Sequence, residues 1–462
     1  MKISNLRLGI IYITFVMLMP SSFYLINWPG YPLISIRRLY VFLWIAVYLV
    51  LLIKYSGVRK SMIDMPYFKA SIFFLVLLGT VSALTYASNP TGMTNFIALA
   101  TETIFPMFMI WSAFKKKESL LFAIKIMIYI YSIFALYGII AYFFKFNPLL
   151  NIMSSGNDSR NLVFIYNDIR GGIQGRAQSF FYHPIVFGYL SSVILIVLLG
   201  VQSVVKLLPR LMFFFIFAVL MSSIFLTSSR SPIVLLLVAF LIFIAHVNLS
   251  KRVSTFGIII ITLFIAYIVL PNSFFDKYSL LIYSIYGDSV KSDLEYGGSS
   301  LQQRLSQFGI AVKYFQESPI FGHGLAFIRK LIESKSAGEL LGAESFLFKL
   351  LIEVGVIGSY AYFALYKKIY SKFRDSTVGN ANDLIKKVSL TGKALLGGHL
   401  AFIFTTGDMD MFNIFLILVT LLLLLIKFLN CDGIYYATSN LYSIMDLESH
   451  VNKKYNNIIK EF

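Results

Sequence analysis

Long apolar runs dominate this sequence and decide what it can fold into. About twelve of them are long enough to cross the ~30 Å hydrocarbon core of a bilayer as α-helices. The runs occupy residues 8–26, 39–53, 67–86, 94–114, 120–143, 184–204, 211–229, 231–248, 254–271, 344–366, 392–406 and 411–430. Because 58% of the residues are hydrophobic and 13% are charged, a soluble domain could not bury this much apolar surface. We therefore expect an all-α, polytopic integral membrane protein.

Three of the runs have atypical patterns. The run at 39–53 is short, and the run at 392–406 is interrupted by glycines, so these two spans have the weakest pattern. The first run follows two cations, as a signal peptide does, but it lacks a cleavage site of small residues. We interpret it as an uncleaved first span.

Lysine and arginine indicate how the spans are oriented. If the N-terminus is cytoplasmic, every alternate short loop is basic. These loops hold Lys54, Arg59 and Lys60; Lys115, Lys116 and Lys117; Lys206 and Arg210; Lys251 and Arg252; and Lys367, Lys368, Lys372, Arg374, Lys386 and Lys387. Only Arg37 and Arg38 break this pattern. The excess of cations in cytoplasmic loops predicts that both termini lie in the cytoplasm.

The remaining segments suggest the domain organisation. We expect a membrane domain over residues 1–430 and a cytoplasmic tail over 431–462. Two long segments then lie outside: one at 144–183, and a larger one at 272–343 between the ninth and tenth spans. Both mix tyrosine, glycine and charge, and long external loops of this kind usually carry function. The single cysteine, Cys431, excludes a disulfide within the chain.

Arginines recur where the external segments meet the membrane. Arg170 and Arg176 precede the sixth span, Arg230 lies between the seventh and eighth, and Arg304 opens a helical pattern in the larger loop. The planar guanidinium group suits bidentate binding of phosphate. Each arginine could instead extend to lipid headgroups or close a loop through an ion pair. For the set, we favour a site for a diphosphate lipid or another anion.

Two residues in or directly after the larger loop are candidates for a general base. Glu344 lies at the outer start of the tenth span, and His323 lies between two glycines. The alternatives are that the helix dipole favours Glu344 at that position and that His323 only packs in a turn. His183 precedes Pro184 at the start of the sixth span, where it could bind phosphate, relay protons or cap the helix.

Ionisable groups also occur inside the spans. Glu102, Glu353 and His399 are functional candidates by their location, with interhelical hydrogen bonding as the alternative. Asp408 and Asp410 are interpreted as an exposed turn. No spacing of histidine, cysteine and carboxylates supports a metal site, and no nucleotide-binding motif occurs. We therefore expect no metal and no cofactor. We also expect no nucleic-acid partner, because the cations are scattered over cytoplasmic loops.

Four stretches, taken in order, resemble the O-antigen ligase and polymerase superfamily of bacterial envelope polysaccharide enzymes. They read GRAQSFFYHPIVFGYL, LTSSRSPIVLLL, RLSQFGIAVKYFQESPIFGHGL and ESFLFKLLIEVGVIG. The long external loop between the ninth and tenth spans also looks like this family. The layout is similar to that of GT-C-like membrane glycosyltransferases.

The resemblance implies metal-independent transfer of a glycan from undecaprenyl diphosphate on the outer face of the bacterial cytoplasmic (inner) membrane. The residues expected to bind the diphosphate are Arg170, Arg176, His183, Arg230 and Arg304. Glu344 or His323 would take the proton of the acceptor hydroxyl. Partners implied are the undecaprenyl-diphosphate-linked oligosaccharide and the bilayer, with a flippase and a chain-length regulator as further candidates.

Three functions are compatible with this reading. Ligases of the superfamily, which transfer the glycan to a lipid A core, commonly carry a histidine where this chain has Glu344. That departure favours a polymerase of O-antigen or capsule, which transfers the growing chain to the next lipid-linked repeat unit. A flippase for lipid-linked oligosaccharides is the third alternative, because the span count and the intramembrane ionisable groups also suit a transporter.

Overall fold

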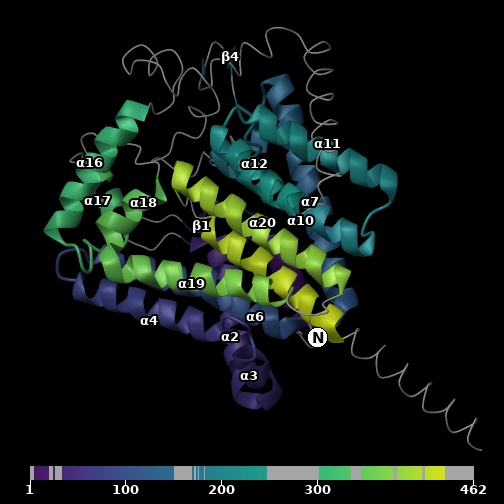
Figure 1. The fold of residues 1–462 in the computed structure, drawn as a ribbon, viewed down its shortest axis with the longest axis horizontal. Coiled ribbons are helices and arrows are strands. Elements are labelled where there is room, and N and C mark those ends of the chain that lie inside the picture. The colour runs from purple at the N-terminus through teal and green to yellow at the C-terminus, as the bar shows by residue number, and fades with distance from the viewer. Residues whose placement is uncertain are drawn as a thin grey trace, which may run out of the picture.

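Helices form nearly all of the regular structure in the computed structural model (Figure 1). The structure describes residues 5–19, 24–26, 34–149, 169–170, 173–174, 176–181, 183–246, 301–333, 345–377, 382–407 and 411–431. The predicted span at 254–271 and the predicted tail beyond residue 431 lie outside the described residues. So do Glu344, Asp408 and Asp410.

The first half of the chain contains helices and two short antiparallel hairpins, β1–β2 and β3–β4. Its elements are α1 (Asn5–Thr14), η1 (Val16–Leu18), β1 (Tyr24–Ile26), β2 (Ile34–Ser35), α2 (Ile36–Lys54), α3 (Ser56–Ile63), α4 (Phe68–Leu84), α5 (Thr91–Leu99), η2 (Ala100–Ile104), α6 (Phe105–Ala113), α7 (Lys117–Phe144), β3 (Ile169–Arg170) and β4 (Ile173–Gln174). The element η2 is a π-helical turn, and it joins α5 and α6 into one continuous span.

The second half consists of helices in the part that the structure describes. They are α10 (Pro184–Val205), α11 (Arg210–Leu226), α12 (Arg230–Ala245), α16 (Leu301–Glu317), α17 (Phe327–Glu333), α18 (Phe346–Lys349), η4 (Leu350–Val354), α19 (Gly355–Asp375), α20 (Asp383–Thr406) and a last helix, Phe412–Cys431. A second π-helical turn, η4, connects α18 to α19.

Within the described residues, seven helices are long and apolar enough to cross a membrane, or up to eight if the bent pair α3–α4 forms one span. The chain bends by 79° between these two helices. Three further apolar helices are shorter: Asn5–Leu18, α11 and α12. This confirms a polytopic helical membrane protein, whereas the total of about twelve spans stays a prediction.

The first predicted span, residues 8–26, is wrong in its second half. The helix ends at Leu18, and Tyr24–Ile26 forms β1. Met19 takes an extended conformation, with φ −72° and ψ 140°, and Pro20 follows it. Proline disfavours the helical conformation of the residue before it, so the chain leaves the helix there.

The two spans with the weakest sequence pattern are helices. The short run at 39–53 becomes α2, because Ser35 accepts a hydrogen bond from the Arg38 N–H and starts the helix earlier. The run at 392–406 becomes the longer α20. Two of its glycines lie against neighbours: a Cβ on Gly392 would be 2.2 Å from the Phe373 ring, and one on Gly398 would be 2.9 Å from the Leu235 carbonyl oxygen. These glycines permit close helix packing.

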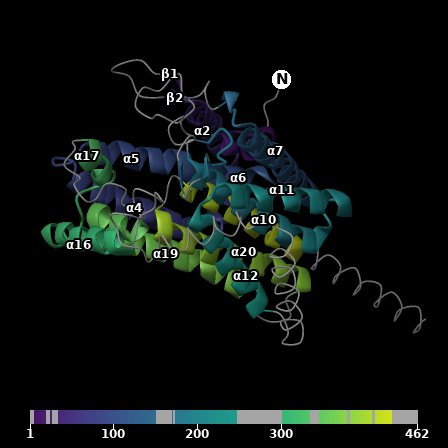
Figure 2. The ribbon, with the colours of Figure 1, turned by 90° about the horizontal axis from the view of Figure 1, so that it is seen from above.

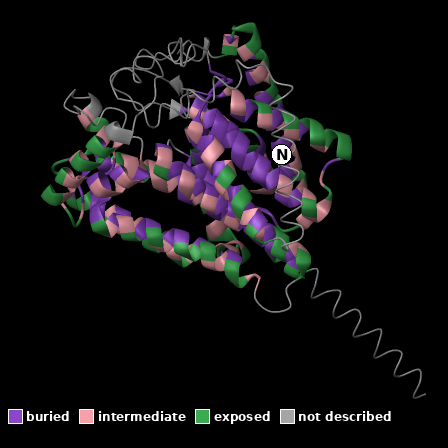
Figure 3. Ribbon diagram, turned by 45° about the horizontal axis from the view of Figure 1, so that its top comes forward, coloured by how far each residue is buried: buried purple, intermediate pink, exposed green. Residues whose placement is uncertain are grey.

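The helices form two packed groups, visible in Figures 1 and 2. In one group α4 lies between α5 and α19, and in the other α10 contacts α11, α12 and α20. Buried residues concentrate in the central helices, where α10 and the last helix are covered almost completely (Figure 3). Both are apolar on all sides, as expected of helices inside a bundle.

Candidate functional site

Arg176 ties the segment before α10 to the junction of α11 and α12. It is 1% exposed. Its Nε–H donates to the Thr227 carbonyl at 2.9 Å, and its Nη2 donates to the Ser229 hydroxyl at 2.5 Å. The next N–H, of Ala177, donates to the Leu226 carbonyl at 3.0 Å. A guanidinium at the last carbonyls of a helix is favourable because that end carries partial negative charge. Arg176 therefore has a structural role that the sequence did not reveal.

Arg230 lies at the same junction. It is the first residue of α12 and is half-buried. Helix α10 approaches this end of α12 closely, since a Cβ on Gly188 would be 2.6 Å from the Pro232 side chain. The structure thus brings Arg176 and Arg230, which are far apart in the sequence, to one helix junction. The first two sequence motifs pack against each other there.

His183 caps α10. Its Nδ1 accepts a hydrogen bond from the Ile185 N–H at 3.1 Å, and Pro184 occupies the first helical turn. A neutral imidazole that accepts at Nδ1 carries its proton on Nε2. The capping interpretation of His183 is confirmed, and a role in binding phosphate stays a prediction.

His323 lies in a tight turn between α16 and α17. Gly322 and Gly324 have φ of 65° and 92°, which is the left-handed region that glycine tolerates. The His323 ring stacks on Phe327 at 4.6 Å between centroids, and its Nε2 lies 3.0 Å from the Tyr314 carbonyl oxygen. Since that carbonyl can only accept, Nε2 donates, and Nδ1 is the nitrogen that could act as a base.

This turn is held against η4 by main-chain hydrogen bonds. The His323 and Gly324 N–H groups donate to the carbonyls of Ile352 and Glu353 at 2.9 and 2.8 Å. Glu353 is 3% exposed, and its Oε1 accepts from the Ile328 N–H at 3.2 Å, at the start of α17. The third and fourth sequence motifs therefore also pack against each other, and Glu353 fixes α17 to the span.

The other predicted site residues are placed less completely. Glu344 is outside the described residues, but Ser345 directly after it caps α18 by accepting from the Leu347 N–H at 3.3 Å. Arg304 is half-buried in α16, and α16 packs on α18 and η4 through Phe308 and Ala311. Arg170 forms the β3–β4 hairpin with Ile173, and its side chain is outside the described part.

One end of α20 connects the two pairs of motifs. The Ser345 hydroxyl donates to the Phe404 carbonyl at 3.0 Å. The hydroxyls of Ser231 and Thr406 are hydrogen-bonded to each other. Because Ser231 follows Arg230, the α10–α12 junction and the start of α18 meet at the same helix end. We call this region, formed by residues 176–181, 183, 227–232, 345–346 and 404–406, the α20 rim.

The buried His399 has a structural explanation. It is 0% exposed, and its two ring nitrogens lie 2.9 Å from the Tyr189 hydroxyl and 3.2 Å from the Tyr366 hydroxyl. The ring also stacks on Phe415 at 4.0 Å between centroids. These contacts link four helices, so the interhelical hydrogen-bonding interpretation holds for His399.

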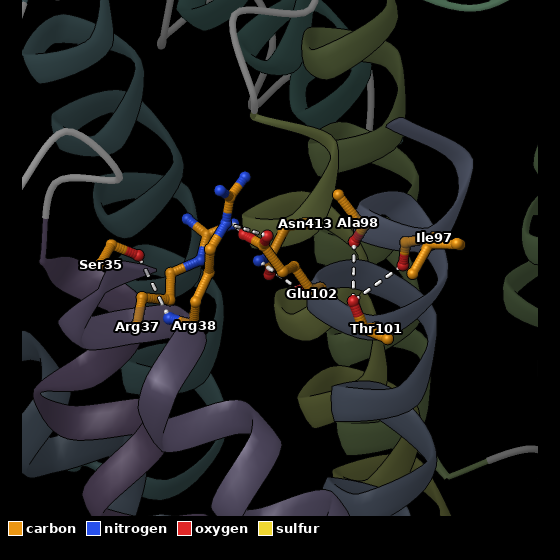
Figure 4. Close-up of polar contacts among 8 residues, drawn as sticks. All are labelled: Ser35, Arg37, Arg38, Ile97, Ala98, Thr101, Glu102 and Asn413. Atoms are coloured by element: carbon orange, nitrogen blue, oxygen red, sulfur yellow. Dashed lines mark hydrogen bonds and ion pairs between the residues drawn. The ribbon is translucent and has the colours of Figure 1, made fainter. Parts of the chain in front are cut away.

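The two arginines that broke the charge pattern of the loops pair with Glu102 (Figure 4). Arg38 Nε donates to the Glu102 carboxylate at 2.6 Å, and Arg37 Nη2 lies 3.8 Å from its other oxygen. The sequence separation of 64 residues between Arg38 and Glu102 hid this contact. An unexpected cation beside one span and an unexpected anion inside another were the only signals of it.

Among the described residues, no three histidines, cysteines or carboxylates gather as a metal site would require. The one cysteine, Cys431, is exposed at the end of the last helix. Metal independence of the reaction stays a prediction.

The long apolar helices, packed around a buried core, define a multi-pass membrane protein. Residues 214–363, from α11 into α19, match the model of a protein family described as O-antigen ligase. This match covers about a third of the chain and confirms the resemblance to the O-antigen ligase and polymerase superfamily. It contains the motifs around Arg230, Arg304, His323 and Glu344. No curated protein matches the chain.

Proposed function

We propose that this protein is a polymerase of a bacterial surface polysaccharide, either O-antigen or capsule. It would transfer the growing glycan from undecaprenyl diphosphate to the next lipid-linked repeat unit, on the outer face of the cytoplasmic membrane. The observation that carries the proposal is the packing of the four motifs: the first, second and fourth meet at the α20 rim, and the third packs against the fourth at η4. Holding a donor phosphate and an acceptor in one place is the main requirement for such a transfer.

The reaction needs no redox step. The acceptor hydroxyl oxygen attacks the anomeric carbon of the donor sugar, and the bond from that carbon to the diphosphate oxygen breaks. The electron pair leaves with the diphosphate, and the hydroxyl proton goes to the carboxylate of Glu344 or to Nδ1 of His323. Guanidinium groups near the diphosphate stabilise the charge that builds up as it leaves.

The burial of the arginines divides their roles in this proposal. Arg230 is half-buried and starts α12, so its fork can meet a phosphate directly. Arg176 is buried against Thr227 and Ser229, so it acts mainly by positioning the rim. Arg304, half-buried on α16, would approach from the large loop together with His323.

Purified protein in liposomes tests the proposal. Supplied with lipid-linked repeat units, it should produce a ladder of longer glycans, and deleting the gene should leave single repeat units on the cell surface. Long polysaccharide that persists unchanged after deletion would show that the protein is not the polymerase.

A ligase is the second candidate, because the matching family is described as O-antigen ligase. Deletion would then leave long carrier-linked polymer beside an acceptor that carries no glycan. A flippase would move the lipid-linked oligosaccharide across liposomes without extending it. The polymerase proposal also implies location in the inner membrane, both termini in the cytoplasm, and a flippase and chain-length regulator as partners.

A further inference from the structure

The turn between α4 and α5 packs against the turn that carries His323. This α4–α5 turn, residues 85–90, lies outside the four motifs and outside the matched residues 214–363, so neither assigns it a role. Helix α17 lies beside it (Figure 2), and the Lys330 Nζ donates to the Ser88 carbonyl at 3.0 Å. In the predicted orientation both turns are on the outer side of the membrane.

Asn89 forms two hydrogen bonds to the His323 turn. It is 0% exposed, and its Nδ2 donates to the carbonyls of Leu325 at 3.0 Å and His323 at 3.3 Å. Its Oδ1 accepts from the Thr91 hydroxyl at 2.6 Å. Because a carbonyl can only accept, the amide nitrogen must face the His323 turn, and the amide oxygen faces Thr91. A buried amide that uses its donors in this way fixes the turn in place.

Two glycines allow the turns to approach this closely. A Cβ on Gly324 would be 2.5 Å from the Thr85 Oγ1 and 3.0 Å from the Asn89 Nδ2. On the other partner, a Cβ on Gly92 would be 3.4 Å from main-chain atoms of Leu325. The two surfaces therefore fit each other only without these side chains, which makes the contact a specific one.

The His323 ring is oriented by α16 and α17. Its Nε2 donates to the Tyr314 carbonyl at 3.0 Å, and its face stacks on Phe327 at 4.6 Å between centroids. The side chain is 20% exposed, so an acceptor can reach the ring. The Glu317 carboxylate is 3.8 Å from Nε2, where it would balance the charge of the ring after Nδ1 has taken a proton.

The position of the whole turn relative to the spans is set by two elements. One is η4, whose carbonyls accept from the His323 and Gly324 N–H groups, and the other is the α4–α5 turn through Asn89. A general base must lie within about 2.6–3.2 Å of the proton that it takes. A displacement of about 1 Å can lower the rate about a hundredfold.

We infer that Asn89 is a positioning residue for His323. It holds the main chain on both sides of Gly324, so that the Nδ1 of His323 stays at the distance from the acceptor hydroxyl that proton transfer requires. The inference rests on the proposed function, because it needs a reaction in which His323 takes that proton.

Glycan extension in liposomes tests this inference with Asn89→Ala, which removes both donors from the His323 turn. We expect kcat to fall about ten- to a hundredfold, while KM for the lipid-linked donor stays the same because the arginines are untouched. Asn95→Ala is the matched control, since its amide donates within α5, to the Thr91 carbonyl at 2.8 Å, and it should extend glycans normally. Normal extension by Asn89→Ala would overturn the inference.

A double variant separates positioning from a general loss of structure. If Asn89 acts through His323, adding Asn89→Ala to His323→Asn costs nothing more, and the double variant extends glycans as fast as His323→Asn alone. Losses that multiply in the double variant would show that Asn89 acts elsewhere, and they would overturn the inference.

Thr91→Val decides the question if Asn89→Ala does not fold. Thr91 is exposed, and its hydroxyl orients the Asn89 amide, so the variant should fold and lower kcat about two- to tenfold. This loss should also disappear in the His323→Asn background. An unchanged kcat in Thr91→Val, with Asn89→Ala unfolded, rejects the inference.

Amide hydrogen exchange of residues 318–328 keeps the inference apart from the proposed function. Asn89→Ala should speed exchange in this segment, and Asn95→Ala should not. Absent extension by the unaltered protein, with faster exchange in Asn89→Ala, rejects the polymerase alone. Unchanged exchange in Asn89→Ala, or full extension by His323→Asn in an active protein, rejects the inference alone.

Discussion

At the scale of single residues, most polar groups that the sequence placed in or beside spans have a partner inside the protein. Arg176 bonds to the end of α11, His183 caps α10, His399 joins two tyrosines and Glu353 holds α17. The sequence located these residues correctly at helix ends or within spans. It could not distinguish a structural partner from a substrate, because that depends on which side chain lies opposite.

Arg176 and Arg230 should respond differently to substitution. Arg176→Ala removes the guanidinium donor from the Thr227 carbonyl and the Ser229 hydroxyl, so we expect the protein to lose about 1–3 kcal/mol of stability together with glycan extension. Arg176→Lys should restore only part of the stability and of the glycan extension, because lysine lacks the planar guanidinium group.

Arg230→Ala should reduce glycan extension with a smaller change in stability. Thermal unfolding in detergent and the glycan ladder measure the two effects, and normal results for Arg176→Ala would exclude its positioning role.

The identity of the base can be tested directly. Loss of a general base lowers a rate by about 10²- to 10⁴-fold, so either Glu344→Gln or His323→Asn should reduce extension by that factor while donor binding is retained. Ser345→Ala is the control, since it removes the cap of α18 and not a base. Full extension by both variants would mean that neither residue takes the proton.

At the scale of elements, two spans contain π-helical turns, and both turns carry a carboxylate. Glu102 lies in η2 and Glu353 in η4. Hydrophobic periodicity predicts continuous helices over both spans and says nothing of these turns, because one extra residue in a turn hardly alters an apolar run. The break after η4 occurs at Gly355, which has φ of 57°.

Gly355 should not tolerate a side chain. A Cβ there would lie 2.7 Å from the Gly322 nitrogen and from the Ile320 carbonyl oxygen, and the left-handed φ adds strain. We expect Gly355→Ala to destabilise the protein by more than about 1 kcal/mol, measured by thermal unfolding in detergent. Gly309→Ala, in the interior of α16 with open space around it, should stabilise by about 0.5–1 kcal/mol. Equal behaviour of the two variants would contradict this account of the turn.

At the scale of the whole molecule, helices from distant parts of the sequence meet at α20. One end of it contacts α12 and the segment before α18, so the two groups of helices share the rim. At the opposite end of the bundle, Asn5 accepts from the Trp44 indole at 2.8 Å and donates to Ser112 at 3.3 Å. The start of α1 therefore lies near the loop that holds Lys115 to Lys117, in agreement with the positive-inside pattern.

The single cysteine provides a test of orientation. Cys431 is exposed at the end of the last helix, so a membrane-impermeant maleimide should label it only after the cells are permeabilised. In a Cys431→Ser background, Ala87→Cys, exposed between α4 and α5, should be labelled in intact cells. Labelling of Cys431 in intact cells would reverse the predicted topology.

The sequence by itself determined the class of protein and the position of most helices, because burying an apolar run in a bilayer is a local property of twenty or so residues. Four ordered motifs also resemble those of the O-antigen ligase and polymerase superfamily, and the match at residues 214–363, which contains three of them, supports this resemblance. Only the tertiary structure decided that the first, second and fourth motifs meet at the α20 rim, and that Arg37 and Arg38 pair with Glu102. Those outcomes depend on contacts between residues far apart in the chain, where the partner of a buried charge is set by helix packing and not by its neighbours in sequence.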